Sequence, residues 1–113
     1  MTNYAVGHLA EEYAAKYLEK LGYEILALNW KTRYCEIDII SKRKKVIYFI
    51  EVKYRKTADQ GAGLDYITAK KLGKMQFAAR MWVSENDWNN DYSLGALEVS
   101  GPEFEVTNFL SEL

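Results

Sequence analysis

The sequence predicts an α+β protein with a mixed β-sheet flanked by helices. Residues 5–21 carry apolar side chains at helical spacing, and a second segment with this spacing begins near Thr68. Between them, three segments within residues 23–53 are rich in β-branched and aromatic residues, which is typical of strands. The chain has 113 residues, 49% of them hydrophobic, which suits a single domain over residues 1–113 with one core.

The first expected helix covers residues 5–21. Its apolar residues recur every three or four positions, so they form one stripe on the helix surface. Gly22 follows the last of them, and glycine is common just past the C-terminal end of a helix. The stripe consists of Leu9, Ala10, Tyr13, Ala14, Tyr17, Leu18 and Leu21.

Three strands are expected next, over residues 23–30, 34–41 and 45–53. The third is dominated by β-branched and aromatic residues, as expected for a central strand. In the second strand, Ile37 and Ile39 should share one face, because successive side chains alternate between the faces of a sheet. The polar residues 41–45 between these two strands predict a hairpin turn.

The remaining residues predict a loop, a helix and two short strands. Residues 54–67 contain Gly61 and Gly63 and are expected to form the loop. Thr68 suits the N-cap of the second helix, because its hydroxyl can accept a hydrogen bond from the first helical turn. The buried stripe of this helix should contain Leu72, Met75, Ala79 and Trp82, and the final strands should cover residues 93–99 and 103–107. The expected order is α-β-β-β-α-β(-β), in which the final strand over residues 103–107 is optional.

Composition excludes several classes of protein. The only cysteine is Cys35 and the only histidine is His8, so no internal disulfide can form and this chain alone cannot build a zinc finger. No apolar run is long enough for a transmembrane helix, and the N-terminal residues lack the features of a signal peptide. We therefore expect a cytoplasmic protein without a membrane partner.

Charge is unevenly distributed along the chain, although the formal net charge is only −1. Residues 31–56 hold nine basic and three acidic side chains, whereas residues 84–113 hold seven acidic and no basic ones. The basic middle of the chain is compatible with a nucleic-acid surface. Solvated strand edges and a charged turn are the alternative explanation.

Three charged residues interrupt the two most apolar strands: Asp38, Glu51 and Lys53. Glu51 and Lys53 are two residues apart on one strand and therefore share a face. If Lys42 pairs with Lys45 around a two-residue loop, Glu36 faces Glu51, and Asp38 lies one diagonal step from Glu51, roughly 7–8 Å away. A three-residue loop without a bulge would instead place Asp38 on the opposite face.

Two carboxylates that converge in an apolar sheet require a neutralising partner. Carboxylate oxygens and water suit Mg²⁺ or Mn²⁺, and such an ion can activate a water and offset charge on a phosphate. Lys53 could then orient the water or stabilise the charged transition state. The alternative is a structural one, in which Glu51 and Lys53 belong to a cross-strand ion pair on a solvated face.

Four segments of the chain form a familiar series of motifs. They are G-x-x-A-E-x-x-A-A-x-Y-L at Gly7–Leu18, N-W-K at Asn29–Lys31, C-E-I-D-I-I at Cys35–Ile40 and F-I-E-V-K-Y-R at Phe49–Arg55. In order and spacing they resemble the YraN-type family of small bacterial proteins. That family is placed in the PD-(D/E)XK superfamily, which has the restriction-endonuclease-like fold and a likeness to archaeal Holliday-junction resolvases.

The resemblance implies a metal site at Asp38 and Glu51, with Lys53 as the catalytic lysine. It also matches Glu11 to the acid of the family's first helix and Lys71 to its downstream lysine. The sequence departs from the family pattern at Cys35 and Ala10, where glycine is usual. It departs again at Ala96, where the family's R-F-D-V segment has its arginine.

Together these observations predict a metal-dependent nuclease or nuclease-related protein that acts on nucleic acid, with DNA as the expected partner. Arg55, Lys56, Lys71 and Lys74 are the expected contacts to phosphates. Resolvase-like enzymes often pair two active sites, so analogy also suggests a homodimer. Two alternatives stay open: a non-catalytic module that binds nucleic acid or protein on the same fold, and a structural subunit with an acidic interaction face.

Overall fold

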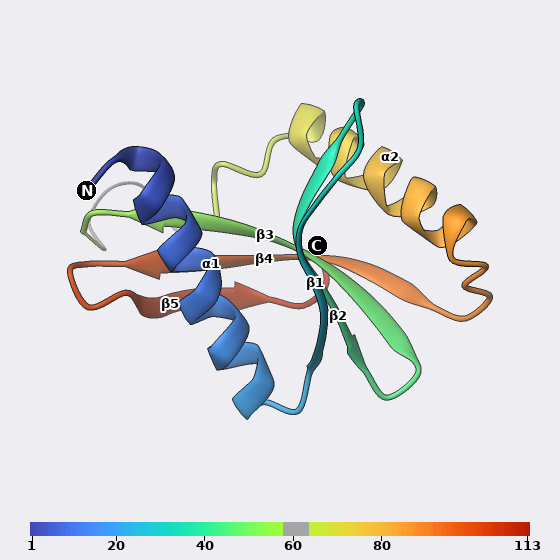
Figure 1. Ribbon diagram of the computed structural model, residues 1–113, viewed down its shortest axis with the longest axis horizontal. Helices are drawn as coiled ribbons and strands as arrows, with labels where there is room; N and C mark the ends of the chain where they lie inside the picture. The colour runs from blue at the N-terminus through green and yellow to red at the C-terminus, as the bar shows by residue number, and fades with distance from the viewer. Residues whose placement is uncertain (58–63) are drawn as a thin grey trace.

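The computed structural model describes residues 1–57 and 64–113. Within these two ranges, two helices and five strands follow one another in the predicted order (Figure 1). They are α1 (Asn3–Lys20), β1 (Glu24–Lys31), β2 (Glu36–Arg43), β3 (Val46–Arg55), α2 (Ala69–Glu85), β4 (Tyr92–Ser100) and β5 (Glu105–Leu110). The fold is α+β with a mixed sheet, which confirms the predicted class.

The five strands form one sheet in the order β1-β2-β3-β4-β5. All neighbouring pairs are antiparallel except β3 and β4, which run parallel. A parallel pair needs a crossover connection, and α2 provides it between these two strands. Helix α1 packs on β1, β3, β4 and β5, whereas α2 packs on β2 and β4 from the other side.

The ends of both helices follow from local sequence. The Thr2 hydroxyl accepts a hydrogen bond from the Ala5 amide, and the Thr68 hydroxyl accepts one from the Lys71 amide. Both threonines therefore cap helices, as expected for Thr68. Gly22 lies just past α1 with a positive φ of 94°, a conformation that glycine adopts without steric strain.

The sheet separates two apolar clusters, one under each helix. On the α1 side, small buried residues such as Ala10 and Ala14 bring the helix close to the strands. On the α2 side, Phe49 is 1% exposed and packs edge-on against Trp82. The predicted helical stripes are thus confirmed in their centres, although Tyr13 and Leu21 at the margin of the first are 41% and 44% exposed.

The hairpin between β2 and β3 differs from the expected register. Arg43 pairs with Val46, so the two-residue loop is Lys44-Lys45, and Lys44 has a positive φ of 58°. The proposed pairing of Lys42 with Lys45 is therefore wrong, and Lys42 pairs with Ile47 instead. With this register Asp38 stands across from Glu51 on the neighbouring strand, but Asp38 lines a pocket with residues of α1 and Glu51 lines one with residues of α2.

Several element boundaries also differ. Strand β3 continues to Arg55, where a loop was expected, and β5 begins at Glu105 and ends at Leu110, later than predicted. Ile37 and Ile39 do not share one core: Ile39 packs under α1 and Ile37 under α2. Gly61 and Gly63 of the expected loop lie outside the described residues.

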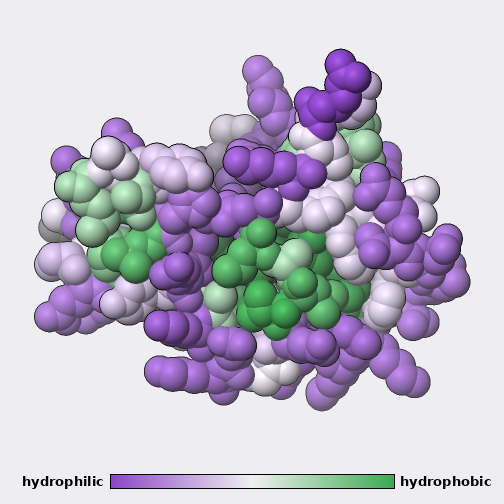
Figure 2. Space-filling model, viewed as in Figure 1, coloured by the Kyte–Doolittle hydropathy of each residue, from purple (hydrophilic) through white to green (hydrophobic). Residues whose placement is uncertain are grey.

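One apolar surface lies away from the acidic residues of the sheet. Figure 2 shows apolar side chains gathered beside α1 and over β1, where Leu26 and Leu28 are 39% and 40% exposed. Strand β1 lies at one edge of the sheet, so no further strand pairs with its outer side. Within the described parts of the chain, neither helix is long and apolar enough to cross a membrane.

Candidate active site

The two strand carboxylates meet where β2 and β3 separate. Their ladder ends at the pair Ile39 and Ile50, so Asp38 and Glu51 are the next residues on the two strands. There the Val52 amide donates its hydrogen bond to Asp38 Oδ2, at 2.8 Å. A side-chain carboxylate thus takes the place of a backbone acceptor and fixes the Asp38 side chain between the strands.

The environment of Asp38 favours its protonated form. Burial raises the pKa of the Asp38 carboxyl to about 7, the Val52 hydrogen bond opposes this rise, and Glu11 adds to it. Burial likewise raises the pKa of Glu51, and the charge of Asp38 raises it further, while Lys71 acts in the opposite direction. The two carboxylates are therefore close enough to repel each other, and a cation between them would relieve that repulsion.

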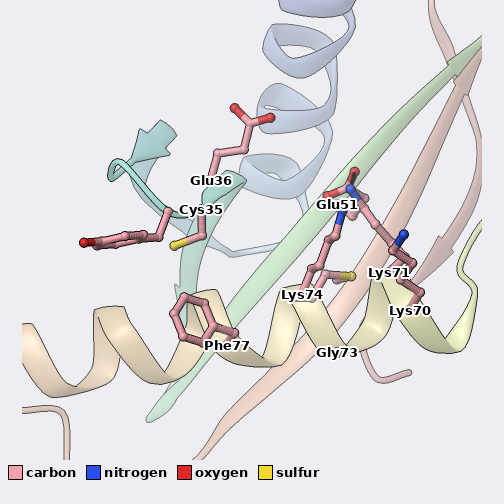
Figure 3. Close-up of a pocket in the computed structure, with 10 residues that line it drawn as sticks. Cys35, Glu36, Glu51, Lys70, Lys71, Gly73, Lys74 and Phe77 are labelled. Carbon is pink, nitrogen blue, oxygen red and sulfur yellow. Dashed lines mark ion pairs between the residues drawn. The ribbon is translucent and has the colours of Figure 1, made fainter.

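A lysine from α2 reaches one of these carboxylates. Lys71 Nζ lies 2.9 Å from Glu51 Oε1, and Figure 3 shows its side chain directed from the helix toward the strand. Desolvation lowers the pKa of Lys71, but the hydrogen bond and charge of Glu51 outweigh this effect and leave the pKa raised. Sequence analysis matched Lys71 to the family's downstream lysine without placing it beside Glu51, and its expected contact with phosphate stays a prediction.

A third carboxylate comes from α1. The side chain of Glu11 is 12% exposed and lies close enough to Asp38 to raise the pKa of that carboxyl. His8, one helical turn earlier, places Nδ1 3.6 Å from Glu11 Oε1 and 3.3 Å from the side-chain nitrogen of Asn29. Glu11 of α1 therefore neighbours Asp38 of β2, which in turn neighbours Glu51 of β3.

Lys53 follows Glu51 by two residues on β3 and is exposed. Its Nζ lies 6.0 Å from the centre of the Tyr66 ring, close to the limit for a cation–π contact. The Tyr66 hydroxyl is buried and has no hydrogen-bond partner among the residues that the structure describes. Burial raises the pKa of Tyr66 well above its usual value, and the charges of Glu51 and Glu98 add to this, so the phenol stays a hydrogen-bond donor.

Arg55 is directed toward β4. Its Nε lies 2.6 Å from Glu98 Oε2, and Nη2 lies 2.8 Å from Asp65 Oδ1. Glu98 is 3% exposed and also accepts a hydrogen bond from the Thr107 hydroxyl. The hydrogen bond to Glu98 raises the pKa of Arg55 above its usual value. The guanidinium thus neutralises a buried carboxylate, whereas sequence analysis expected it to contact phosphate.

Replacing Arg55 with methionine is expected to lower the melting temperature by roughly 10 °C or more, because the buried Glu98 carboxylate loses its charged partner. Thermal unfolding followed by circular dichroism measures this effect. Lys31→Met is the matched control, because it breaks an ion pair with Glu36 in which both side chains are more than half exposed. That variant should change the melting temperature by about 2 °C or less. Equal shifts for the two variants would contradict a structural role for Arg55.

The other predicted basic contacts lie on the surface. Lys74 is exposed on α2 and lines the same pocket as Lys71, whereas Lys56 is exposed just after β3. Sequence analysis missed Tyr66 as part of the site, because it falls in an expected loop without a pattern. Glu98 carried a usable signal, since it is a charged residue inside an apolar strand, as Asp38 and Glu51 are.

The chemistry of the carboxylates suits a hard divalent cation. Among residues 1–57 and 64–113, no three His, Cys, Asp or Glu side chains are grouped closely enough to hold a metal ion by themselves. Mg²⁺, however, usually keeps several waters and uses only one or two carboxylates together with substrate phosphates. Asp38 and Glu51, which lie across from each other where β2 and β3 separate, could supply those two carboxylates.

Fold and site together define a small α+β protein with acidic and lysine side chains gathered where two central strands separate. Residues 10–106 match the model of the Uncharacterised protein family UPF0102, and the chain belongs to this family. This confirms the family expected from the motifs.

Relatives of similar length come from several bacteria. The chain is 36% identical over 107 residues to a UPF0102 protein of Sulfurihydrogenibium sp. (strain YO3AOP1), which covers 93% of each chain. It is 36% identical over 121 residues to one of Tropheryma whipplei (strain Twist), covering 100% of this chain and 97% of the relative. One of Helicobacter pylori (strain HPAG1) is 39% identical over 102 residues, covering 90% and 87%.

Proposed function

We propose that this protein is a metal-dependent nuclease of the PD-(D/E)XK type that hydrolyses phosphodiester bonds in nucleic acid. One observation carries the proposal: Asp38 and Glu51 converge at the point where β2 and β3 separate, with Lys53 two residues further on the same face. The α+β fold, with α2 as the crossover between parallel β3 and β4, supports the same assignment.

In this function, Asp38 and Glu51 would hold Mg²⁺ or Mn²⁺. The bound ion would supply a water of lowered pKa and offset charge on the phosphate. The Val52 amide keeps the Asp38 carboxylate in place, and Glu11 can accept a hydrogen bond from a water beside it. Lys53 is exposed toward solvent, where its ammonium can orient the attacking water or stabilise the charged transition state.

A second candidate function is a non-catalytic nucleic-acid-binding module. The observation that favours it is the ion pair between Lys71 and Glu51, because the ammonium already neutralises one of the two strand carboxylates. In such a module, nucleic-acid binding would not depend on Asp38 or on a divalent ion. A nuclease instead needs Glu51 to release or share this lysine when the metal binds.

The test is cleavage of labelled single-stranded, duplex, flap and four-way-junction DNA, with Mg²⁺ or Mn²⁺ compared with EDTA. We expect cutting that requires the metal and is lost in Asp38→Asn, which retains an acceptor for the Val52 amide but loses the charge. The folded state of the variant is checked by circular dichroism. Binding without cutting on every substrate, unaffected by metal and by the variant, would reject the nuclease and favour the non-catalytic module.

A further inference from the structure

A pocket of about 560 Å³ lies beside Glu51, between α2 and the start of β2. It opens onto Glu51, and three lysines of α2 line it: Lys70, Lys71 and Lys74 (Figure 3). Lys71 is paired with Glu51, whereas Lys70 and Lys74 form no ion pair with any other residue that the structure describes. This wall of the pocket therefore offers cations to an anionic ligand.

Two exposed aromatic side chains line the same pocket. Phe77 of α2 is 52% exposed, and Tyr34, in the turn between β1 and β2, is 68% exposed. The turn is fixed locally, because the Thr32 hydroxyl accepts hydrogen bonds from the amides of Tyr34 and Cys35. In Figure 1 this hairpin rises beside α2. Both rings are more than half exposed to water. The Arg33 guanidinium lies 5.3 Å from the centre of the Tyr34 ring, so it covers one face of that ring and adds a positive charge beside the other.

A glycine in the middle of α2 also faces this pocket. Gly73 lies between Lys70 and Phe77, and a Cβ atom built at this position would meet no atom within 4 Å. Protein packing therefore does not require the glycine, although glycine inside a helix lowers stability relative to alanine. Its effect is to keep the pocket wall open between the lysines and the aromatic ring.

We propose that this pocket binds an unpaired nucleic-acid strand, with bases stacked on Tyr34 and Phe77 and phosphates held by Lys70 and Lys74. The combination of a positive groove and exposed aromatic rings is the usual way in which proteins bind single strands. Bases of a duplex are already stacked on one another and do not present their faces to such rings. The inference rests on the proposed function, because it names the substrate class of the same site.

The experiment measures binding separately from cleavage. Fluorescence anisotropy in EDTA gives the Kd for a labelled DNA single strand, the RNA of the same sequence and the DNA duplex. We expect the single strands to bind at least about tenfold more tightly than the duplex. Tyr34→Ala and Phe77→Ala should each weaken single-strand binding by about 5–50-fold and leave duplex binding unchanged. The two single strands show whether DNA or RNA is preferred.

Two further variants test whether a loss of binding is specific to this pocket. Tyr13→Ala removes an exposed tyrosine of α1, on the other face of the sheet, and should leave every Kd unchanged. Gly73→Gln should weaken single-strand binding because its side chain enters the groove, whereas thermal unfolding should show that the fold is retained.

Three outcomes would overturn the inference: a duplex that binds as tightly as the single strand, aromatic variants that bind like the wild type, or no binding of any strand. A different result would separate the two proposals. If Tyr34→Ala and Phe77→Ala weaken single-strand binding as expected but the wild type cuts no substrate, the nuclease is rejected and the single-strand pocket is supported.

Discussion

Lys53→Ala is expected to reduce the rate of metal-dependent cleavage by at least about 100-fold, while the Kd for nucleic acid changes by less than about threefold. The reason is that Lys53 stands beside the acidic residues, on the same face as Glu51, and its ammonium would act on charge that develops only in the transition state. Single-turnover cleavage with enzyme in excess gives the rate constant, and anisotropy in EDTA gives the Kd.

Lys45→Ala provides the control for this loss. Lys45 is an exposed lysine in the loop between β2 and β3, at the far end of the hairpin from Asp38 and Glu51. Its removal changes the net charge by the same amount as Lys53→Ala but should leave the rate constant within about twofold of the wild type. If both variants cut at the wild-type rate, Lys53 has no part in the chemistry, and the comparison with the family's catalytic lysine fails for this chain.

Asp38→Asn is expected to stabilise the protein at pH 8 by about 2–4 kcal/mol and to have little effect near pH 3.5. In the wild type, the pKa of Asp38 is about 7 in the folded state, compared with an ordinary value of 3.8. The unfolded chain therefore releases this proton near pH 4, while the folded protein keeps it until about pH 7. The contribution of Asp38 to stability is complete below pH 4 and is lost as the pH rises through 7.

Urea unfolding at several pH values measures this difference, and Asp91→Asn, at an exposed aspartate, is the control variant. Adding Mg²⁺ at pH 8 should raise the stability of the wild type, because an ion that binds only the folded state stabilises it. Asp38→Asn should respond much less. A wild type and an Asp38→Asn variant that differ by the same amount at every pH would show that Asp38 titrates normally in the folded protein.

The sequence was sufficient to single out Asp38 and Glu51 as candidate site residues, but not to show how their side chains lie. Asp38 and Glu51 stood out because charged side chains are costly inside apolar strands. Their geometry depended on the hairpin loop, which lies at Lys44-Lys45 with Lys44 in the left-handed region. Glycine and asparagine favour that conformation, and lysine does not, so the run of basic residues gave no local sign of where the chain turns.

The roles of the basic residues depended even more on long-range packing. Arg55 and Lys56 are neighbours in a basic segment, yet Arg55 pairs with Glu98 from another strand and Lys56 is exposed. Glu98 comes next to Arg55 only because β4 lies parallel to β3 after the α2 crossover. No pattern within a few residues of Arg55 carries that information.

Over the part of the chain that the structure describes, the sequence by itself was sufficient to predict both helices, the first four strands, their order and the family, while the fifth strand was left open. These features depend on apolar periodicity, threonine caps and short motifs, all of which act over a few residues. Tertiary structure alone decided the contact of Asp38 with the Val52 amide, the burial of the Tyr66 hydroxyl, and the pocket that Tyr34 and Phe77 share. Each of these joins residues far apart in the chain, and their distances are set by strand register and by helix packing on the sheet.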